Sequence, residues 1–169
     1  MPSRPLRPPA GNQPVVSVDY DTVYDYVIVG AGNSGMNCLQ AVLDVEPDAK
    51  CLVVDKREEV GGCWNEFYSF VKLHQPASVF GVSGYTKLWV QDADATLASR
   101  LSILDHFQRV AASLPPNVSF LLSASFTEST KDDAGLFNIG VALPSDAKKT
   151  LKSKNLIDAR AFNYLVPEP

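Results

Sequence analysis

Three glycines stand where a strand is expected to turn into a helix, and they are the residues best suited to binding a ligand. They occupy positions 30, 32 and 35 as G-x-G-x-x-G, after the β-branched run Val27–Val29. Apolar residues at helical spacing follow over 36–42. Such glycines allow a tight turn, close approach of a pyrophosphate, and close packing of helix on strand. The amides around Asn33 to Met36 would then point at an anion, assisted by the helix dipole.

A carboxylate follows at the offset that this motif requires. A second β-branched strand, Cys51–Val54, ends at Asp55, about 20 residues beyond the third glycine. An acid at this place accepts hydrogen bonds from ribose hydroxyls and repels a 2′-phosphate, which disfavours NADP here. Lys56 and Arg57 keep that choice open, although a solvated strand end also explains them. Together these residues predict a dinucleotide-binding turn.

Composition predicts one packed domain. The chain has 169 residues, of which 46% are hydrophobic, too many for a disordered chain. The net charge of −4 argues against nucleic acid and anionic membranes as partners. No apolar run reaches the roughly 20 residues of a membrane span.

Residues 1–22 are expected to form a flexible, proline-rich tail before a domain over 23–169. The tail has no apolar segment after its two arginines, which argues against a secretory signal. Three widely spaced cysteines without C-x-x-C predict neither zinc nor disulfides, and favour a reducing, cytoplasmic location. Cys38 and Cys51 are expected to be small core residues.

A glycine pair and an aromatic stretch come after the acid. Gly61 and Gly62 permit a turn that other residues resist, and Trp64, Phe67 and Tyr68 follow. A simple NAD-binding domain would continue into another helix. The loop suits an extended cofactor with a flat ring, or it is an ordinary aromatic-capped turn.

These motifs resemble the N-terminal FAD-binding part of the flavin-containing monooxygenases and their Baeyer–Villiger and N-hydroxylating relatives. The resemblance rests on GAGNSG (30–35), VVDKREEVGGCW (53–64) and KLHQP (72–76), and extends loosely to Ala159. It implies an oxidoreductase that holds FAD at the first site. In that family NADPH is the co-substrate, and oxygen is transferred to a soft nucleophile or a ketone.

The resemblance also implies a site. The glycine turn would hold the diphosphate and Asp55 the adenosine ribose, while Cys63 and Trp64 would lie beside the cofactor. His74 and Gln75 would lie near the isoalloxazine ring. The candidate cofactor-binding residues are Gly30, Ala31, Gly32, Asn33, Ser34, Gly35, Asp55, Lys56, Gly62, Cys63, Trp64, His74 and Gln75. No catalytic side chain and no metal ligand stands out, and Asn65 is either a flavin contact or a turn residue.

Flavin disulfide reductases share the first motifs but need two redox cysteines just after the glycine pair. Cys63 has no second cysteine over 64–68, so a dithiol mechanism is excluded. A second glycine motif and the aromatic-glycine-histidine signature before it are also missing, and I-D-A-R-A-F (157–162) replaces an A-T-G type turn. We therefore expect a truncated chain without an NADPH domain. A non-catalytic module for FAD, NAD or ADP, or an inactive remnant of low solubility, remains an alternative.

The remaining pattern predicts an incomplete, three-layer Rossmann-like α/β domain. A helix is expected from Asp92 to Leu114, capped by Asp92 or Asp94, with His106 on its solvated side. Its apolar stripe would consist of Leu97, Leu101, Leu104, Gln108 and Ala111. A parallel strand over 118–122, an antiparallel pair over 123–130 and 136–143, and a returning strand over 151–159 would complete a parallel sheet with a β-meander.

Overall fold

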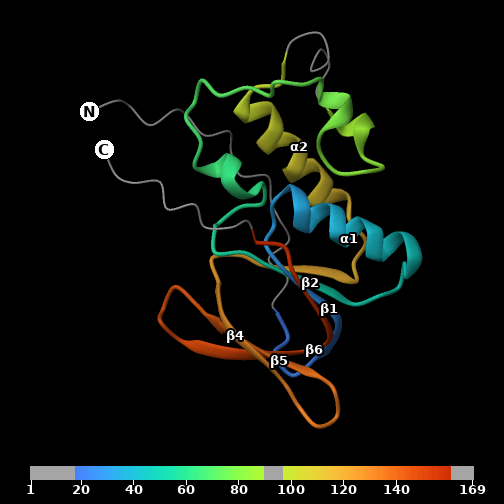
Figure 1. The fold of residues 1–169 in the computed structure, drawn as a ribbon, viewed down its shortest axis with the longest axis vertical. Helices are drawn as coiled ribbons and strands as arrows, with labels where there is room; N and C mark the ends of the chain where they lie inside the picture. Colours follow the sequence, from blue (N-terminus) through green and yellow to red (C-terminus); the bar gives the residue numbers. More distant parts are fainter. Residues whose placement is uncertain (1–17, 90–96, 161–169) are drawn as a thin grey trace.

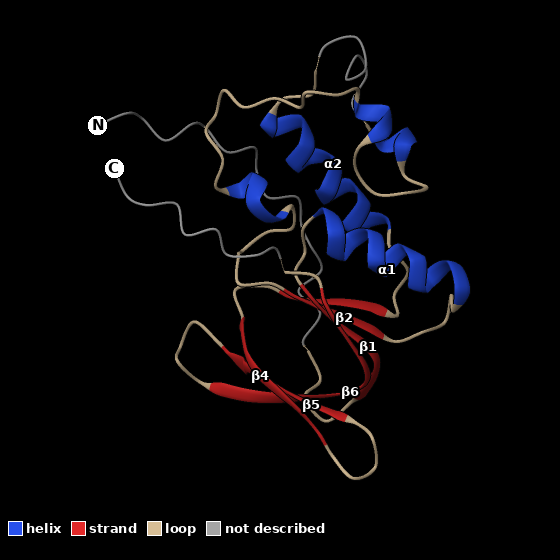
Figure 2. Cartoon of the chain, viewed as in Figure 1, coloured by secondary structure: helices blue, strands red, loops and turns tan. Residues whose placement is uncertain are grey.

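In the part of the chain that the structure describes, six strands form one sheet, and two α-helices lie on one side of it (Figures 1 and 2). The computed structural model describes residues 18–89 and 97–160. The strands are β1 (Val23–Val29), β2 (Cys51–Val54), β3 (Val118–Leu121), β4 (Ser125–Lys131), β5 (Phe137–Ala142) and β6 (Lys148–Asp158). The α-helices are α1 (Asn33–Val45) and α2 (Arg100–Ser113), and the short 3-10 turns are η1 (Gly62–Asn65), η2 (Ala77–Val79) and η3 (Thr86–Leu88).

The order of strands is β3-β2-β1-β6-β5-β4. The pairs β3–β2, β2–β1 and β1–β6 are parallel, whereas β6–β5 and β5–β4 are antiparallel. The long strand β6 joins the two parts, because residues 148–153 pair with β5 and residues 152–158 pair with β1. This arrangement confirms the predicted Rossmann-like parallel sheet with a β-meander.

Both faces of β2 and of the last three residues of β1 are buried, which explains their unbroken apolar runs. Side chains alternate between the faces of a strand. Ile28 and Val53 therefore pack with α1 and α2, while Val27 and Val29 pack with Ile139 and other residues of the meander. The chain thus has three layers: helices, parallel strands and the curled meander (Figure 2).

Most of the predicted elements are present with ends shifted by a few residues. Cys51 is fully buried in β2, where burial raises the pKa of its thiol to about 11, and this confirms it as a core residue. Cys38 is half-buried on α1. Most of the predicted tail, residues 1–17, and residues 161–162 of the I-D-A-R-A-F stretch lie outside the described residues. Within the described ranges, no helix is long and apolar enough to cross a membrane.

The prediction for α2 was wrong in its start and in its buried face. The helix begins at Arg100, and its N-cap is Ser99, whose hydroxyl accepts a hydrogen bond from the amide of Ser102. The proposed caps Asp92 and Asp94 lie outside the described residues. Leu97 and Leu101 of the predicted stripe are 45% and 43% exposed. Leu104 of the predicted stripe is buried, and the other buried residues of the helix are Ile103, His106, Phe107 and Val110.

His106 is buried rather than solvated, with 1% of its surface exposed. The segment around residues 80–89 covers it: the Trp89 ring stacks on the imidazole at 4.2 Å, and Nε2 accepts a hydrogen bond from the Val82 amide at 3.3 Å. The proton of the neutral ring is therefore on Nδ1, which has no hydrogen-bond partner among the described residues. Burial lowers the pKa of His106 to about 4, and the charge of Asp105 opposes this only in part.

Acid is expected to destabilise the fold through His106. Because the pKa of this histidine is lower in the folded chain than the ordinary 6.5, the unfolded chain binds the proton more tightly, and stability falls as the pH drops from about 6.5 to about 4. The loss is up to roughly 3 kcal/mol. Urea unfolding at pH 7 and at pH 4.5 should show a smaller loss for His106→Gln than for the wild type. The exposed His74→Gln serves as control and should keep the full loss. Equal losses in all three proteins would contradict this account.

Candidate dinucleotide-binding site

The glycine turn connects β1 to α1 through a close contact. Gly30 has a φ of +112°, in the region that favours glycine, and its amide donates to the Val54 carbonyl of β2 at 2.7 Å. A methyl group on Gly35 would overlap the carbonyl oxygen of Gly30. The predicted close packing of helix on strand at the third glycine is therefore confirmed.

The first turn of α1 has no side-chain cap and no acidic residue of its own in the described chain. Gly32 is the N-cap and provides no side chain. Amides in the first turn of a helix have no partner within the helix, and their dipoles favour an anion. Those of Asn33, Ser34 and Gly35 can therefore donate to a phosphate.

The glycine pair after β2 lies directly against this turn. The amide of Gly61 donates to the Ala31 carbonyl at 2.8 Å. A methyl group on Gly62 would come within 2.7 Å of the Gly32 Cα atom. Gly61 and Gly62 also have φ values of +114° and +59°. The two glycine motifs, distant in sequence, thus form one surface.

Asp55 holds the glycine turn to the end of β2. Its side chain is buried, and Oδ2 accepts a hydrogen bond from the Ala31 amide at 2.7 Å. Oδ1 accepts one from the Arg57 amide at 2.9 Å. Each carboxylate oxygen has two acceptor positions, so each retains one for a ribose hydroxyl. The acid is where the sequence places it, and it also has a structural role that the spacing does not reveal.

Two basic residues follow Asp55 and differ in their surroundings. Lys56 is exposed. Arg57 is partly buried, and its guanidinium forms two hydrogen bonds with the carboxylate of Glu66, both at 3.0 Å. Its Nη1 also lies 3.6 Å from Asp55 Oδ1. The interpretation of both residues as a solvated strand end is therefore correct for Lys56 and wrong for Arg57.

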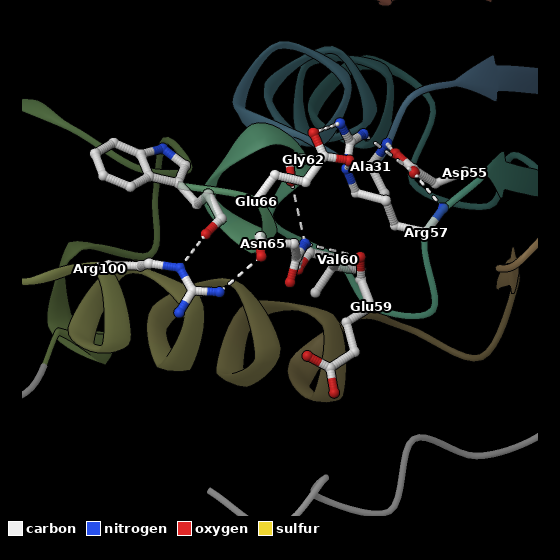
Figure 3. A network of polar contacts seen from close by, with 10 residues as sticks. Ala31, Asp55, Arg57, Glu59, Val60, Gly62, Asn65, Glu66 and Arg100 are labelled. Carbon is white, nitrogen blue, oxygen red and sulfur yellow. Dashed lines mark hydrogen bonds and ion pairs between the residues drawn. The ribbon is translucent and has the colours of Figure 1, made fainter. Parts of the chain in front are cut away.

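Polar contacts hold the loop that carries the glycine pair (Figure 3). The Asn65 amide group donates to the carbonyls of Glu59, Val60 and Gly62 at 3.2–3.3 Å. Arg100, at the start of α2, donates to the carbonyls of Trp64 and Asn65 at 2.6 and 2.7 Å. Asn65 therefore acts as a turn residue, and its contact with a flavin stays a prediction.

The other candidate residues are more dispersed. Cys63 is exposed next to Gly62, whereas the ring of Trp64 is buried against Phe67 and Phe80, with centroids 5.0 and 5.9 Å away. His74 is exposed and Gln75 half-buried. Both follow Leu73, whose amide donates to Ala98 just before α2. The structure thus brings together the residues predicted for the diphosphate and ribose, and places the side chain of Trp64 in the core.

Ala159 is part of the site and was not predicted. Its amide donates to the Val29 carbonyl at 2.9 Å, at the end of β6. The Ala159 carbonyl oxygen lies 3.1 Å from the position that a Cβ atom on Gly30 would occupy. The Ala159 methyl group lies 3.5 Å from the position of a Cβ atom on Gly35. A small residue fits this place between the two glycines. The sequence could have indicated Ala159 through the strand predicted over 151–159. When this strand returns parallel to β1, the carboxyl ends of both strands lie at one edge of the sheet.

Comparison with known proteins supports the fold and leaves the family open. The sequence matches no protein-family model. Over 59 residues, 35% of the chain, it is 37% identical to uncharacterised proteins of Mycobacterium tuberculosis and Mycobacterium bovis, and this stretch spans only 11% of their length.

The chain is similar in fold to solved structures that include a disulfide reductase and a monooxygenase. Bacillithiol disulfide reductase from Bacillus cereus has a TM-score of 0.68 at 13% identity, over 81% of this chain and 39% of that protein. Cyclohexanone monooxygenase has a TM-score of 0.61 at 18% identity, over 88% of this chain and 28% of that protein. OTEMO, solved with FAD and NADP, has a TM-score of 0.59 at 21% identity, over 80% of this chain and 25% of that protein. The chain has the Rossmann-like fold of these proteins, and it spans less than half of each.

Gly35→Ala tests the contact on which the turn depends. Alanine is the better helix former by about 1 kcal/mol, yet its methyl group would overlap the Gly30 carbonyl oxygen. We expect an unfolding free energy lower by about 3 kcal/mol or more in urea titrations. Gly84→Ala is the control: Gly84, unlike Gly35, has a positive φ, of +81°, but no described atom lies within 4 Å of the added methyl group, so its loss should stay near 1 kcal/mol. A Gly35→Ala protein as stable as the wild type would show that α1 does not pack as described.

Proposed function

We propose that this chain binds FAD through its adenosine diphosphate half and belongs to an NADPH- and oxygen-dependent monooxygenase. The observation that carries the proposal is the start of α1, a helix end without a side-chain cap in the described chain, beside a buried carboxylate that binds the same turn. A diphosphate fits the amides and an adjoining ribose fits Asp55. The fold shared with FAD-dependent oxidoreductases supports the choice of FAD.

The residues of this chain would bind and orient the cofactor. Asn33 and Ser34 would donate their amides to phosphate oxygens, and Asp55 would accept from the ribose while it keeps its bonds to Ala31 and Arg57. The loop tied down by Asn65 and Arg100 would keep Gly62 against the turn. When bound, the flavin supplies the redox chemistry, as cofactors of this kind do.

A second candidate is a non-catalytic module for adenine dinucleotides. One observation favours it: the residues that lie together, from the glycine turn to Asp55, are those proposed for the adenosine half. His74, predicted for the flavin half, is exposed on a loop tied to the start of α2.

Incubation with FAD, desalting and an absorbance scan separate the two. Retained flavin supports binding of FAD, and reduction of that flavin by NADPH supports the monooxygenase over the module. The first proposal is refuted if FAD is lost while ADP or NAD binds.

Replacing Asp55 by Asn should weaken binding of FAD or ADP roughly 10- to 100-fold, since a hydrogen bond to a charged group contributes about 1.5–3 kcal/mol. Asparagine is preferred to alanine because its oxygen can still accept from the Ala31 amide. Fluorescence titration of bound FAD measures the affinity, and far-UV circular dichroism checks the fold. The exposed Asp44→Asn on α1 is the control and should bind as the wild type does. Unchanged affinity in Asp55→Asn would rule out the ribose contact.

A further inference from the structure

The main chain fixes Arg57 next to the carboxylate proposed to hold the ribose. Its amide donates to Asp55 Oδ1 at 2.9 Å, and its carbonyl accepts from the Ser123 amide at 2.8 Å. Nη1 lies 3.6 Å from the same oxygen of Asp55. Any group attached to a ribose hydroxyl at Asp55 would therefore come close to this guanidinium.

Glu66 holds the guanidinium in place. Nε donates to Oε1 and Nη2 to Oε2, both at 3.0 Å, the two-point geometry in which arginine binds carboxylates and phosphates most strongly. The hydrogen bonds from Arg57 lower the pKa of the Glu66 carboxyl, so Glu66 is ionised at neutral pH. The Arg57 side chain is 21% exposed and that of Glu66 61%. Figure 3 shows the guanidinium between the carboxylates of Glu66 and Asp55.

This arrangement bears on the choice of nucleotide. An arginine near the ribose acid is the usual means of accommodating a 2′-phosphate. Here the face of the guanidinium that would bind a phosphate is occupied by Glu66, and the buried Asp55 lies on its other side. A 2′-phosphate would have to displace Glu66 and approach Asp55 as well.

We propose that Glu66, by holding Arg57, makes this site prefer adenine nucleotides with free ribose hydroxyls over their 2′-phosphorylated counterparts. The proposal rests on the proposed function, because it requires the ribose to lie at Asp55. Glu66 is a positioning residue that acts through Arg57 without touching the ligand. The exposed Lys56, whose charge also lowers the pKa of Glu66, is unchanged in the variants below.

Calorimetric titration of the full chain with two probes tests the proposal. The probes are ADP and adenosine 2′-phosphate 5′-diphosphate, which differ only in the 2′-phosphate. The wild type should bind ADP at least tenfold more tightly. Glu66→Gln should narrow this ratio at least fivefold, through tighter binding of the 2′-phosphorylated probe and with ADP affinity within twofold of the wild type. Adding Arg57→Met to Glu66→Gln should restore a wide ratio, because the freed guanidinium is then gone.

Glu128→Gln on β4 is the matched control. It removes one exposed negative charge and should leave the ratio unchanged. The proposal is overturned if Glu66→Gln keeps the wild-type ratio of the two affinities, or if the ratio stays narrowed in the double variant. In either case, ADP binding would leave the proposed function standing. If the wild type binds neither probe, the proposed function fails and this inference fails with it. Because Glu66 is largely exposed, its replacement by Gln should not prevent folding, and circular dichroism verifies this.

Discussion

The contact between Gly35 and the Gly30 carbonyl sets the position of the remaining parts of the site. It brings the first turn of α1 onto the end of β1, so that the helix amides lie beside the carboxyl ends of the parallel strands. Ligands of open α/β sheets bind at this edge. Gly62 packs on Gly32 and Ala159 fits against Gly30, so segments from three parts of the chain meet at one turn. A larger side chain at any of these places would separate them.

Asp55 connects this packing to electrostatics. Its carboxylate accepts the amides of Ala31 and Arg57, and it thereby stabilises the turn with or without a ligand. Arg57 then pairs with Glu66, while Arg100 of α2 fixes the carbonyls of Trp64 and Asn65. The segment after β2 is long and nearly without regular structure, and these charged and amide contacts give it a defined path. The helix layer and the site are therefore coupled through main-chain carbonyls.

The sequence predicted those features that depend on residues close to one another in the chain. The spacing of the three glycines, the β-branched run Val27–Val29 and the alternation from Phe137 to Val141 each reflect a requirement within a few residues, and the strands and the turn were predicted from them. His106 could not be placed in this way, because its burial comes from Val82 and Trp89, in a segment without periodicity. The pairing of Arg57 with Glu66 and the contacts of Arg100 likewise arise only when distant segments meet. Ala159 joins the site through the register of β6 with β1.

The central claim is that the amides at the start of α1 bind a diphosphate. Titration of the ¹⁵N-labelled chain with ADP, followed by amide chemical shifts, tests it most directly. The account predicts saturable shifts concentrated on residues 31–35, with smaller ones at Gly62 and Arg57, and none on the exposed strand β4. Saturable binding that leaves residues 31–35 unshifted, or a spectrum that does not change at millimolar ADP, would contradict it.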